Sequence, residues 1–395
     1  MELVMKNNVS VRYCEDYSIH EVADALDKCL EDIGGLNNII RPKSKVMLKC
    51  HLSTNNQPND AKTTHPSIVI AIAEKLAKLG ANCIIADCPE STSDLSKIYE
   101  TTQMLYASNQ GNAELNLDET VVEQEIDGTK TKKITLLQLV NDVDYIINIP
   151  KLIIDKTFVV KGAVDNLFGL VPSEMQDILK NRLFLPKDYN NYLLDILSVV
   201  NSKTVLNILD GVVASEIDGT QRIFNVIAAS KDAVCLDAGV YNMLGLKLED
   251  YSLFQEADKR QMFDLKTGID IVGDSMELFK KQDLILPPKD PDGQNTSVSA
   301  KKRKQLYLLT QERPNVDINK CKGCKKCFLA CPVNAIMEGR DENGEIFAKI
   351  SLDTCINCLR CVRTCPYQAI GVVMPLKYKN MQAKIDKKLI DKQQQ

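Results

Sequence analysis

The chain has 395 residues, of which 44% are hydrophobic and 26% charged, and its formal net charge at pH 7 is -4. This length suits two or three domains, and so small a net charge gives no sign of a nucleic-acid or membrane partner. The first twenty residues lack the apolar stretch of a secretory signal, and no uncharged apolar run reaches the roughly 18–20 residues of a membrane span. We therefore expect a cytoplasmic protein whose fourteen cysteines are metal ligands or free thiols rather than disulfides.

Strand-like and helix-like segments alternate from residue 1 to about residue 286. Residues 65–80 predict a helix, because Ile68, Ile72 and Leu76 fall on one helical face, and Thr64 is the expected N-cap. This alternation predicts an α/β fold with a mostly parallel sheet. The predicted strands cover residues 45–50, 82–87, 144–151, 205–211 and 225–230, and a further helix covers residues 232–245.

Charged residues end four of these predicted strands. They are Lys49, Asp87, Lys151 and Asp210. Ligands of open α/β sheets bind outside the carboxyl ends of the strands. We therefore predict a site there, with Lys151, Asp210 and Asp87 as candidate catalytic residues. The alternative is that the two aspartates, which precede turn residues, only form turns.

A second set of residues predicts a binding site for a small anion, such as a carboxylate or phosphate. The segment TTHP opens a helix, and helix N-termini favour anions. The segment KGAVDNLFGLVP, residues 161–172, adds a lysine and an asparagine. Helix capping is the alternative role for the second threonine and for the asparagine, and no GxGxxG, P-loop or HExxH motif is present. The candidate cofactor- or ligand-binding residues are Thr63, Thr64, His65, Lys49, Lys161 and Asn166.

Four segments between residues 40 and 250 together resemble the family named domain of unknown function three-six-two. They read TTHPSIVIAIAEKLAKLGANCIIADCP, DYIINIPKLIIDK, KGAVDNLFGLVP and LNILDGV. The resemblance implies an α/β domain with an unassigned redox activity, often fused to a ferredoxin module and found mostly in anaerobic bacteria and archaea. Relatives commonly carry a lysine at Asp165 and a histidine at Asp155, so this member is expected to bind a different substrate or none. A fold-level similarity to the N-terminal domain of lactate racemase is analogy only.

Residues 287–313 are rich in proline, polar and charged residues and predict a linker. Residues 373–395 predict a polar tail. Between them, residues 314–372 form a separate predicted domain.

Two cysteine runs define this C-terminal domain. Residues 321–332 and 355–366 share the spacing CxxCxxCxxxCP, and each cysteine of the second run lies 34 residues after its counterpart. Thiolates suit iron–sulfur clusters or zinc, but structural zinc sites use two separated CxxC pairs. Three cysteines at intervals of three, followed by Cys-Pro, form the bacterial ferredoxin pattern, in which the fourth cysteine ligates the other cluster. We therefore predict two [4Fe–4S] clusters, with two zinc sites as the alternative. Cluster A takes Cys321, Cys324, Cys327 and Cys365, and cluster B takes Cys355, Cys358, Cys361 and Cys331.

The duplication extends beyond the thiols, because CPVNAI in the first half matches CPYQAI in the second. Residues 335–350 between the runs predict two strands joined by a turn at ENG. The domain therefore resembles a small α+β, two-[4Fe–4S] bacterial-type ferredoxin. The other six cysteines show no ligand spacing and are expected to be core or surface thiols: Cys14, Cys29, Cys50, Cys83, Cys88 and Cys235.

These features predict an iron–sulfur electron-transfer protein that delivers low-potential electrons to a redox site or small anionic ligand in the α/β domain. Its partners would be a redox protein or a small anionic substrate. Whether the chain is a [4Fe–4S]-dependent oxidoreductase stays open, and the alternative is a non-catalytic ligand- or partner-binding electron shuttle. A deep cleft where the four charged strand ends converge would favour the enzyme, and a filled, flat surface would favour the shuttle.

Overall fold

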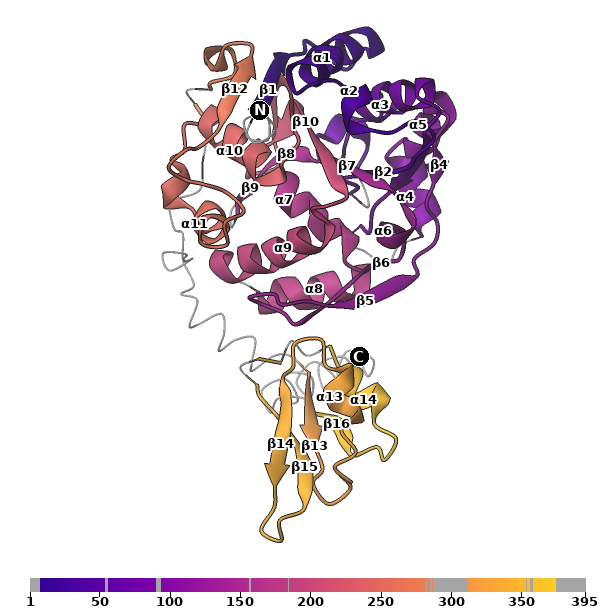
Figure 1. Cartoon of the computed structure of the whole chain (residues 1–395), viewed down its shortest axis with the longest axis vertical. Coiled ribbons are helices and arrows are strands. Elements are labelled where there is room, and N and C mark those ends of the chain that lie inside the picture. Colours follow the sequence, from indigo (N-terminus) through magenta and orange to yellow (C-terminus); the bar gives the residue numbers. More distant parts are fainter. Residues whose placement is uncertain are drawn as a thin grey trace, which may run out of the picture. The chain divides into compact units, whose positions relative to one another are not determined.

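The computed structural model divides the chain into two compact units (Figure 1). The first comprises Met1–Glu123, Thr135–Gln176 and Pro186–Asp292, and the second comprises Gln124–Ile134, Asp177–Leu185 and Gly293–Gln395. The structure describes residues 8–53, 56–89, 94–155, 158–183, 185–281, 283–284, 286, 312–352, 354–355 and 358–373. Residues 287–311 of the predicted linker and 374–395 of the predicted tail lie outside these described residues.

The first unit is built on a ten-stranded mixed sheet in the order β12-β1-β11-β10-β7-β2-β3-β4, with β8 beside β10 and β9 beside β8. Strands β10, β7, β2, β3 and β4 run parallel to one another, which confirms the predicted mostly parallel α/β fold. β11 is antiparallel to both β10 and β1, because residues 216–220 join β10 to β11 as a short hairpin. The strands are β1 (Asn8–Tyr13), β2 (Lys45–Cys50), β3 (Asn82–Ala86), β4 (Glu114–Leu115), β7 (Tyr145–Ile149), β8 (Lys151–Asp155), β9 (Val159–Lys161), β10 (Thr204–Ser215), β11 (Gln221–Ser230) and β12 (Asp270–Gly273).

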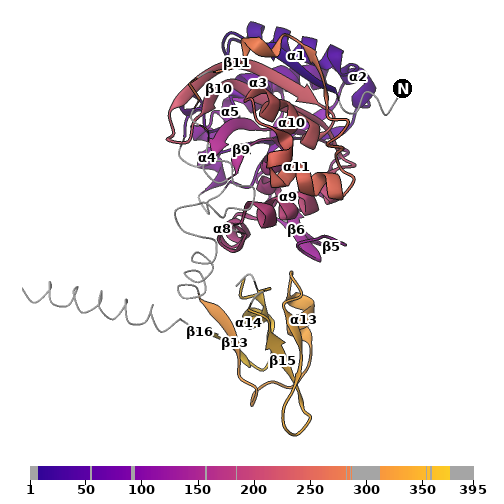
Figure 2. The ribbon, with the colours of Figure 1, turned by 90° about the vertical axis from the view of Figure 1, so that its left-hand side faces the viewer.

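Helices cover both faces of this sheet (Figure 2). α1 (Ile19–Asp32), α3 (Pro66–Lys78) and α5 (Met104–Gly111) pack on one face. The other face carries α7 (Ala163–Asn166), α9 (Pro186–Val200), α10 (Ala233–Met243) and α11 (Ser252–Lys259). The shorter elements are α2 (Leu36–Ile39), α4 (Leu95–Thr101), α6 (Leu139–Asp142), α8 (Ser173–Arg182), η1 (Pro58–Asp60), η2 (Leu167–Leu170), η3 (Leu248–Asp250), η4 (Met276–Leu278), β5 (Val121–Glu125) and β6 (Lys133–Leu137).

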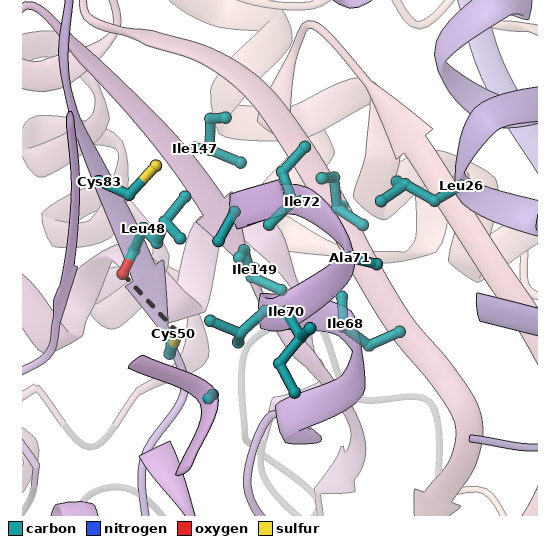
Figure 3. Close-up of a cluster of buried hydrophobic side chains, with 14 of the residues drawn as sticks. Leu26, Leu48, Cys50, Ile68, Ile70, Ala71, Ile72, Cys83, Ile147 and Ile149 are labelled. Carbon is teal, nitrogen blue, oxygen red and sulfur yellow. Dashed lines mark hydrogen bonds between the residues drawn. The ribbon is translucent and has the colours of Figure 1, made fainter. Parts of the chain in front are cut away.

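The main core lies between α3 and the sheet (Figure 3). The predicted apolar face of α3 is buried, and Ile68 and Ile72 pack against Leu48 and Ile149 from neighbouring strands. Successive residues of a strand point to opposite faces. Alternation therefore directs Lys49 toward the face that carries α7, and this places the site described below.

One prediction about α3 is wrong. The N-cap is His65, whose Nδ1 accepts a hydrogen bond from Ser67 N at 3.3 Å, rather than Thr64. The reason is that Pro66 occupies the first helical position, so the residue directly before it becomes the cap. The hydroxyl of Thr64 is thereby available for a different contact.

In the second unit, the described residues from 312 onward form two antiparallel strand pairs and two short helices. β13 (Arg313–Val316) pairs with β16 (Ile370–Val373), and β14 (Ile336–Arg340) pairs with β15 (Ile346–Ile350), which confirms the predicted hairpin. The helices are α13 (Lys326–Ala330) and α14 (Arg360–Thr364).

The internal repeat is also present in the backbone of this unit. Lys325 and Leu359, which lie 34 residues apart, have φ values of 59° and 55° and precede α13 and α14. Asn334 and Gln368, also 34 residues apart, have φ values of 48° and 49°. Non-glycine residues rarely adopt this left-handed conformation, so its recurrence shows that the two halves share one backbone path. None of the described helices is long and apolar enough to cross a membrane.

Candidate functional site

Two cavities in the second unit are each lined by four cysteines. One has Cys321, Cys324 and Cys327 from the first run together with Cys365 from the second. The other has three cysteines of the second run together with the fourth of the first. The structure thus brings together both predicted quartets, including the exchange of the fourth cysteine. The members of the second quartet are Cys355, Cys358, Cys361 and Cys331.

The backbone aims N–H groups at the sulfurs of the two exchanged cysteines. Ala335 N donates to Cys331 Sγ at 3.1 Å, and Ala369 N donates to Cys365 Sγ at 3.3 Å. A hydrogen bond to the charged form of a group favours that form, so both contacts favour the thiolate. Gly323 has φ 59°, and a Cβ there would lie 2.8 Å from Ile346 O, so this position in the first loop requires glycine.

Burial and mutual proximity work against ionisation of the thiols. Burial raises the pKa of Cys327 to about 11, with Cys321, Cys324 and Cys365 as further causes. Burial likewise raises the pKa of Cys361 to about 12, helped by Cys355, Cys358 and Cys331. A coordinated metal deprotonates such thiols. Four converging sulfurs with backbone N–H support are a donor set that fits a [4Fe–4S] cluster.

In the first unit, Lys49 and Asp87 form a buried ion pair. Their side chains are 0% and 4% exposed, and Lys49 Nζ lies 2.7 Å from Asp87 Oδ1. Lys49 Nζ also donates to Cys50 O at 2.7 Å and to Asn166 Oδ1 at 3.3 Å. Asp87 Oδ2 accepts from Leu52 N at 2.8 Å. Desolvation raises the pKa of Asp87, and the charge of Lys49 opposes this shift. Burial of the two charges therefore costs free energy, which their mutual attraction offsets.

Lys151 and Asp210 form a second buried pair, which also involves a tyrosine. Lys151 Nζ lies 3.0 Å from Asp210 Oδ1. The Tyr17 hydroxyl lies 2.6 Å from Lys151 Nζ and donates to Asp210 Oδ1 at 2.7 Å. Burial lowers the pKa of Lys151 and raises the pKa of Tyr17. Both aspartates of the site therefore have a lysine of the chain itself as their counter-charge.

The predicted strand ends at this second pair need a correction. β7 ends at Ile149, and Lys151 begins β8 rather than ending a strand. Asp210 lies inside β10, which continues to Ser215. The reason is that β10 pairs first with β7 and then, from Asp210 onward, with β8.

Tyr17 was not found from the sequence. It lies before α1, far along the chain from every motif, and no spacing marks it. Its ring stacks on that of His65, with 3.7 Å between the ring centroids. Burial lowers the pKa of His65 to about 4. The charge of Asp210 opposes this shift, and the charge of Lys151 adds to it. His65 is therefore a neutral ring at physiological pH, and its backbone N–H donates to Asp210 Oδ2 at 2.8 Å.

The two threonines before α3 bind backbone. Thr63 Oγ1 donates to His51 O at 2.9 Å, and Thr64 Oγ1 donates to Ile149 O at 2.8 Å. Thr64 Oγ1 also accepts from His51 N at 2.8 Å. These bonds fasten the turn before α3 to the ends of β2 and β7. The carboxylate of Asp210, rather than an external anion, meets the N–H of the cap residue.

The segment of residues 161–172 fits closely around buried charges. Asn166 Nδ2 donates to Asn148 Oδ1 at 2.8 Å and to Lys49 O at 3.2 Å. A Cβ on Gly169 would lie 2.1 Å from Asp87 Oδ1, and a Cβ on Gly162 would lie 2.1 Å from an oxygen of Asp237. Both glycines are thus required by close approach to a carboxylate.

A cleft of about 540 Å³ lies beside these pairs. Its charged lining residues are Lys62, Lys161, Asp155, Glu216 and Asp218. Of the predicted α/β site residues, only Lys161 lines it; the four charged strand residues are buried instead. Asp87 is linked to the cleft through the backbone, because it accepts a hydrogen bond from the N–H of Leu52, which lines the cleft. The chemistry available in the cleft is that of two lysines, three carboxylates and the imidazole of His51.

The chain combines an α/β domain with a module whose two cavities are each lined by four cysteines. These two parts define the class of protein, an α/β domain fused to an iron–sulfur unit. Comparison with protein families gives the same division. Residues 46–242 match the model of a domain of unknown function (DUF362), and residues 320–369 match that of a 4Fe-4S dicluster domain. The chain is thus a DUF362 protein with a C-terminal ferredoxin-type module.

Two known proteins are similar to parts of the chain. The "Thylakoid-associated protein sll1697" of Synechocystis sp. (strain ATCC 27184 / PCC 6803 / Kazusa) is 28% identical over 262 residues, which cover 61% of this chain and 76% of that protein. The lactate racemase apoprotein from Thermoanaerobacterium thermosaccharolyticum is 15% identical with a TM-score of 0.39. The match covers 57% of this chain and 55% of the racemase, so the chain spans about half of that protein's length.

Proposed function

We propose that the protein transfers electrons through two [4Fe–4S] clusters, each bound by three cysteines of one run and the fourth of the other. The observation that carries this proposal is the pair of cavities, each lined by such a quartet. Clusters of this kind supply one-electron chemistry, here at a potential on the order of −400 mV. The chain's own contribution is to hold the sulfurs, direct backbone N–H groups at them and limit the access of water.

Metal analysis of anaerobically reconstituted protein tests this proposal. We expect about eight iron and eight acid-labile sulfide per chain, as two cubane clusters require. Stoichiometric zinc without sulfide would show instead that the cavities are zinc sites.

For the α/β domain we propose that the cleft binds a small anionic ligand, which the reduced module supplies with electrons. Lys62 and Lys161 line the cleft, and both can contact a carboxylate or phosphate. Asp87 acts here by holding the N–H of Leu52, and Lys151 and Asp210 pair the strands β8 and β10, whose later residues line the cleft. This activity makes the protein a [4Fe–4S]-dependent oxidoreductase of the cytoplasm in anaerobic metabolism.

A non-catalytic electron shuttle is the second candidate. It is favoured by the pairing of Lys49 and Lys151 with aspartates, because neither lysine then offers an uncompensated charge to a substrate. In this case the cleft binds a ligand or partner without chemistry.

A binding screen of carboxylates and phosphates separates the two candidates. We expect Lys161→Met to weaken the affinity for the ligand about tenfold, as loss of one ion contact of about 1.4 kcal/mol requires. Lys78→Met, at an exposed position in the last turn of α3 and outside the cleft lining, is the matched control. A ligand that oxidises the dithionite-reduced protein indicates an oxidoreductase, and one that binds without oxidising it indicates a shuttle. Binding that Lys161→Met leaves unchanged would contradict the assignment of the cleft.

A further inference from the structure

The two cysteine cavities differ in their access to solvent. Around the first, Cys324 is exposed and Cys321 is half-buried, whereas three of the four cysteines around the second are buried. Electron transfer between proteins requires close approach of the redox centres. The cavity lined by Cys324 is therefore the one that an external protein can reach more closely.

An exposed aromatic residue marks the same cavity. Tyr367 lines it and is 49% exposed. Its counterpart 34 residues earlier is Val333, which is smaller, apolar and partly buried against the core of the module. Exposed tyrosine is enriched in the centres of protein interfaces, so the two halves of the repeat differ here in the direction that favours docking at the first cavity.

Lysines surround this tyrosine and the first cysteine run. Lys320, Lys322, Lys325 and Lys326 are all exposed. Their counterparts in the second run are Thr354, Ile356, Leu359 and Arg360, so three of the four charges are missing there. Two of the lysines have carboxylate neighbours, since Lys320 lies 3.5 Å from Asp317 and Lys325 lies 2.8 Å from Glu338. The excess positive charge therefore rests on Lys322 and Lys326.

We propose that this surface, formed by Tyr367 and the lysines of the first run, is the docking site for an acidic redox protein that exchanges electrons with cluster A. An apolar centre with a charged rim is the usual anatomy of a protein interface, and the sign of the rim selects an acidic partner. The inference rests on the proposed function, because it needs a cluster in the cavity. In the exchange one electron leaves the partner and the cluster gains it, and no bond is formed or broken.

Binding of an acidic flavodoxin to the cluster-loaded full chain tests the proposal by isothermal titration calorimetry at low ionic strength. We expect Lys322→Glu/Lys326→Glu to raise the Kd at least tenfold and Tyr367→Ala to raise it severalfold. Lys349→Glu makes one such charge reversal at an exposed position that lines neither cavity, and it should change the Kd less than twofold. Because surface charges are screened within about 8 Å at 0.15 M salt, the difference between parent and double variant should shrink as salt is added.

A second measurement follows electron transfer from flavodoxin hydroquinone to the oxidised protein, in which we expect the same order of variants. Basic cytochrome c is the opposite-charge probe for binding. Tighter binding of cytochrome c than of flavodoxin, or an unchanged flavodoxin Kd in the double variant, would overturn the docking proposal. Iron and sulfide analysis of every sample keeps the two proposals apart. A parent protein without clusters contradicts the proposed function, whereas a fully loaded protein with an unchanged Kd contradicts only the docking site.

Discussion

The cysteine quartets of the second unit and the lysine–aspartate pairs of the first unit are both sets of reactive side chains brought together by the fold, but they differ in one respect. Each lysine meets a carboxylate of the same chain, at 2.7 Å for Lys49 and 3.0 Å for Lys151. The four cysteines around each cavity instead converge on one another, and backbone N–H groups donate to the sulfurs of Cys331 and Cys365. The pairs are balanced within the chain, and the quartets need a metal to balance them.

This difference separates two interpretations of perturbed side chains. Buried titratable groups are common at functional sites, yet structural ion pairs perturb pKa values as well. Where the counter-charge is supplied by the chain, as for Asp87, the group can shape a neighbouring site without touching a ligand. Substitutions in the cysteine quartets should therefore change the cluster content, whereas substitutions in the lysine–aspartate pairs should lower the free energy of unfolding.

The largest effect is expected from Cys365→Ser. If the quartets are ligand sets, cluster A keeps three thiolates and an oxygen, which favours loss of one iron, while cluster B remains complete. Electron paramagnetic resonance and iron analysis of the reconstituted variant should show one three-iron and one four-iron cluster.

Three further serine variants control this result. Cys324→Ser should resemble Cys365→Ser, and Cys358→Ser should resemble Cys331→Ser. If Cys331→Ser instead resembles Cys324→Ser, each run closes its own cluster and the exchange of the fourth cysteine is wrong.

Lys49→Met should lower the free energy of unfolding of the first unit by about 3–5 kcal/mol, because it leaves a buried carboxylate without its cation. The pKa of Asp87 is already raised by burial, and loss of the lysine raises it further. Protonation of Asp87 then relieves the defect, so the difference from the parent should be largest near pH 8 and smaller near pH 5. Urea unfolding followed by circular dichroism measures both values.

Lys151→Met sharpens the comparison within the first unit. Asp210 keeps the Tyr17 hydroxyl and the His65 N–H as donors, so we expect a smaller loss, about 2–3 kcal/mol. A loss equal to or greater than that of Lys49→Met would show that these two donors do not compensate the carboxylate.

Gly169→Ala should destabilise the first unit by about 1–3 kcal/mol, because the new methyl group overlaps Asp87 and Lys49 and an overpacked core must shift. Gly371→Ala is the control, since no heavy atom lies within 4 Å of its added Cβ, and a change within about 0.5 kcal/mol is expected. Equal unfolding midpoints of Gly169→Ala and the parent would mean that Asp87 moves without cost.

The smallest effect is expected at His65. Its folded pKa of about 4 lies below the ordinary value of about 6.5, so below pH 6.5 the unfolded chain binds the extra proton. His65 therefore stabilises the fold fully above pH 6.5, and that contribution is lost as the pH falls toward 4. Allowing for its partial exposure, we expect a loss of about 1–2 kcal/mol across this window. His65→Asn retains a capping side chain and should remove that part of the pH dependence. If the free energies of unfolding of the two proteins change in parallel from pH 7 to pH 4.5, the assignment is contradicted.

The sequence was most informative where residue type and spacing together define the chemistry. The paired CxxCxxCxxxCP runs led to the quartets, and apolar periodicity led to α3 and to the strands around it. The antiparallel position of β11 and the long course of β10 were not predicted, because both depend on which strands become neighbours in space. Tyr17 was missed for the same reason, since its partners are Lys151 and Asp210, more than 130 positions further along the chain. Lys49 lies near the carboxyl end of its strand, as predicted, whereas Lys151 begins a strand. Only the fold shows that an aspartate pairs with each lysine.

The exchange of the fourth cysteine also has a consequence for the order in which the protein is made. During synthesis the first run, Cys321 to Cys327, leaves the ribosome before any part of the second. Its cavity nevertheless lacks a wall until Cys365 follows, whereas the other cavity has all its cysteines once Cys361 has appeared. The quartet begun first is thus finished last, and a nascent chain that stops between residues 361 and 365 carries one finished set of sulfurs and one open set.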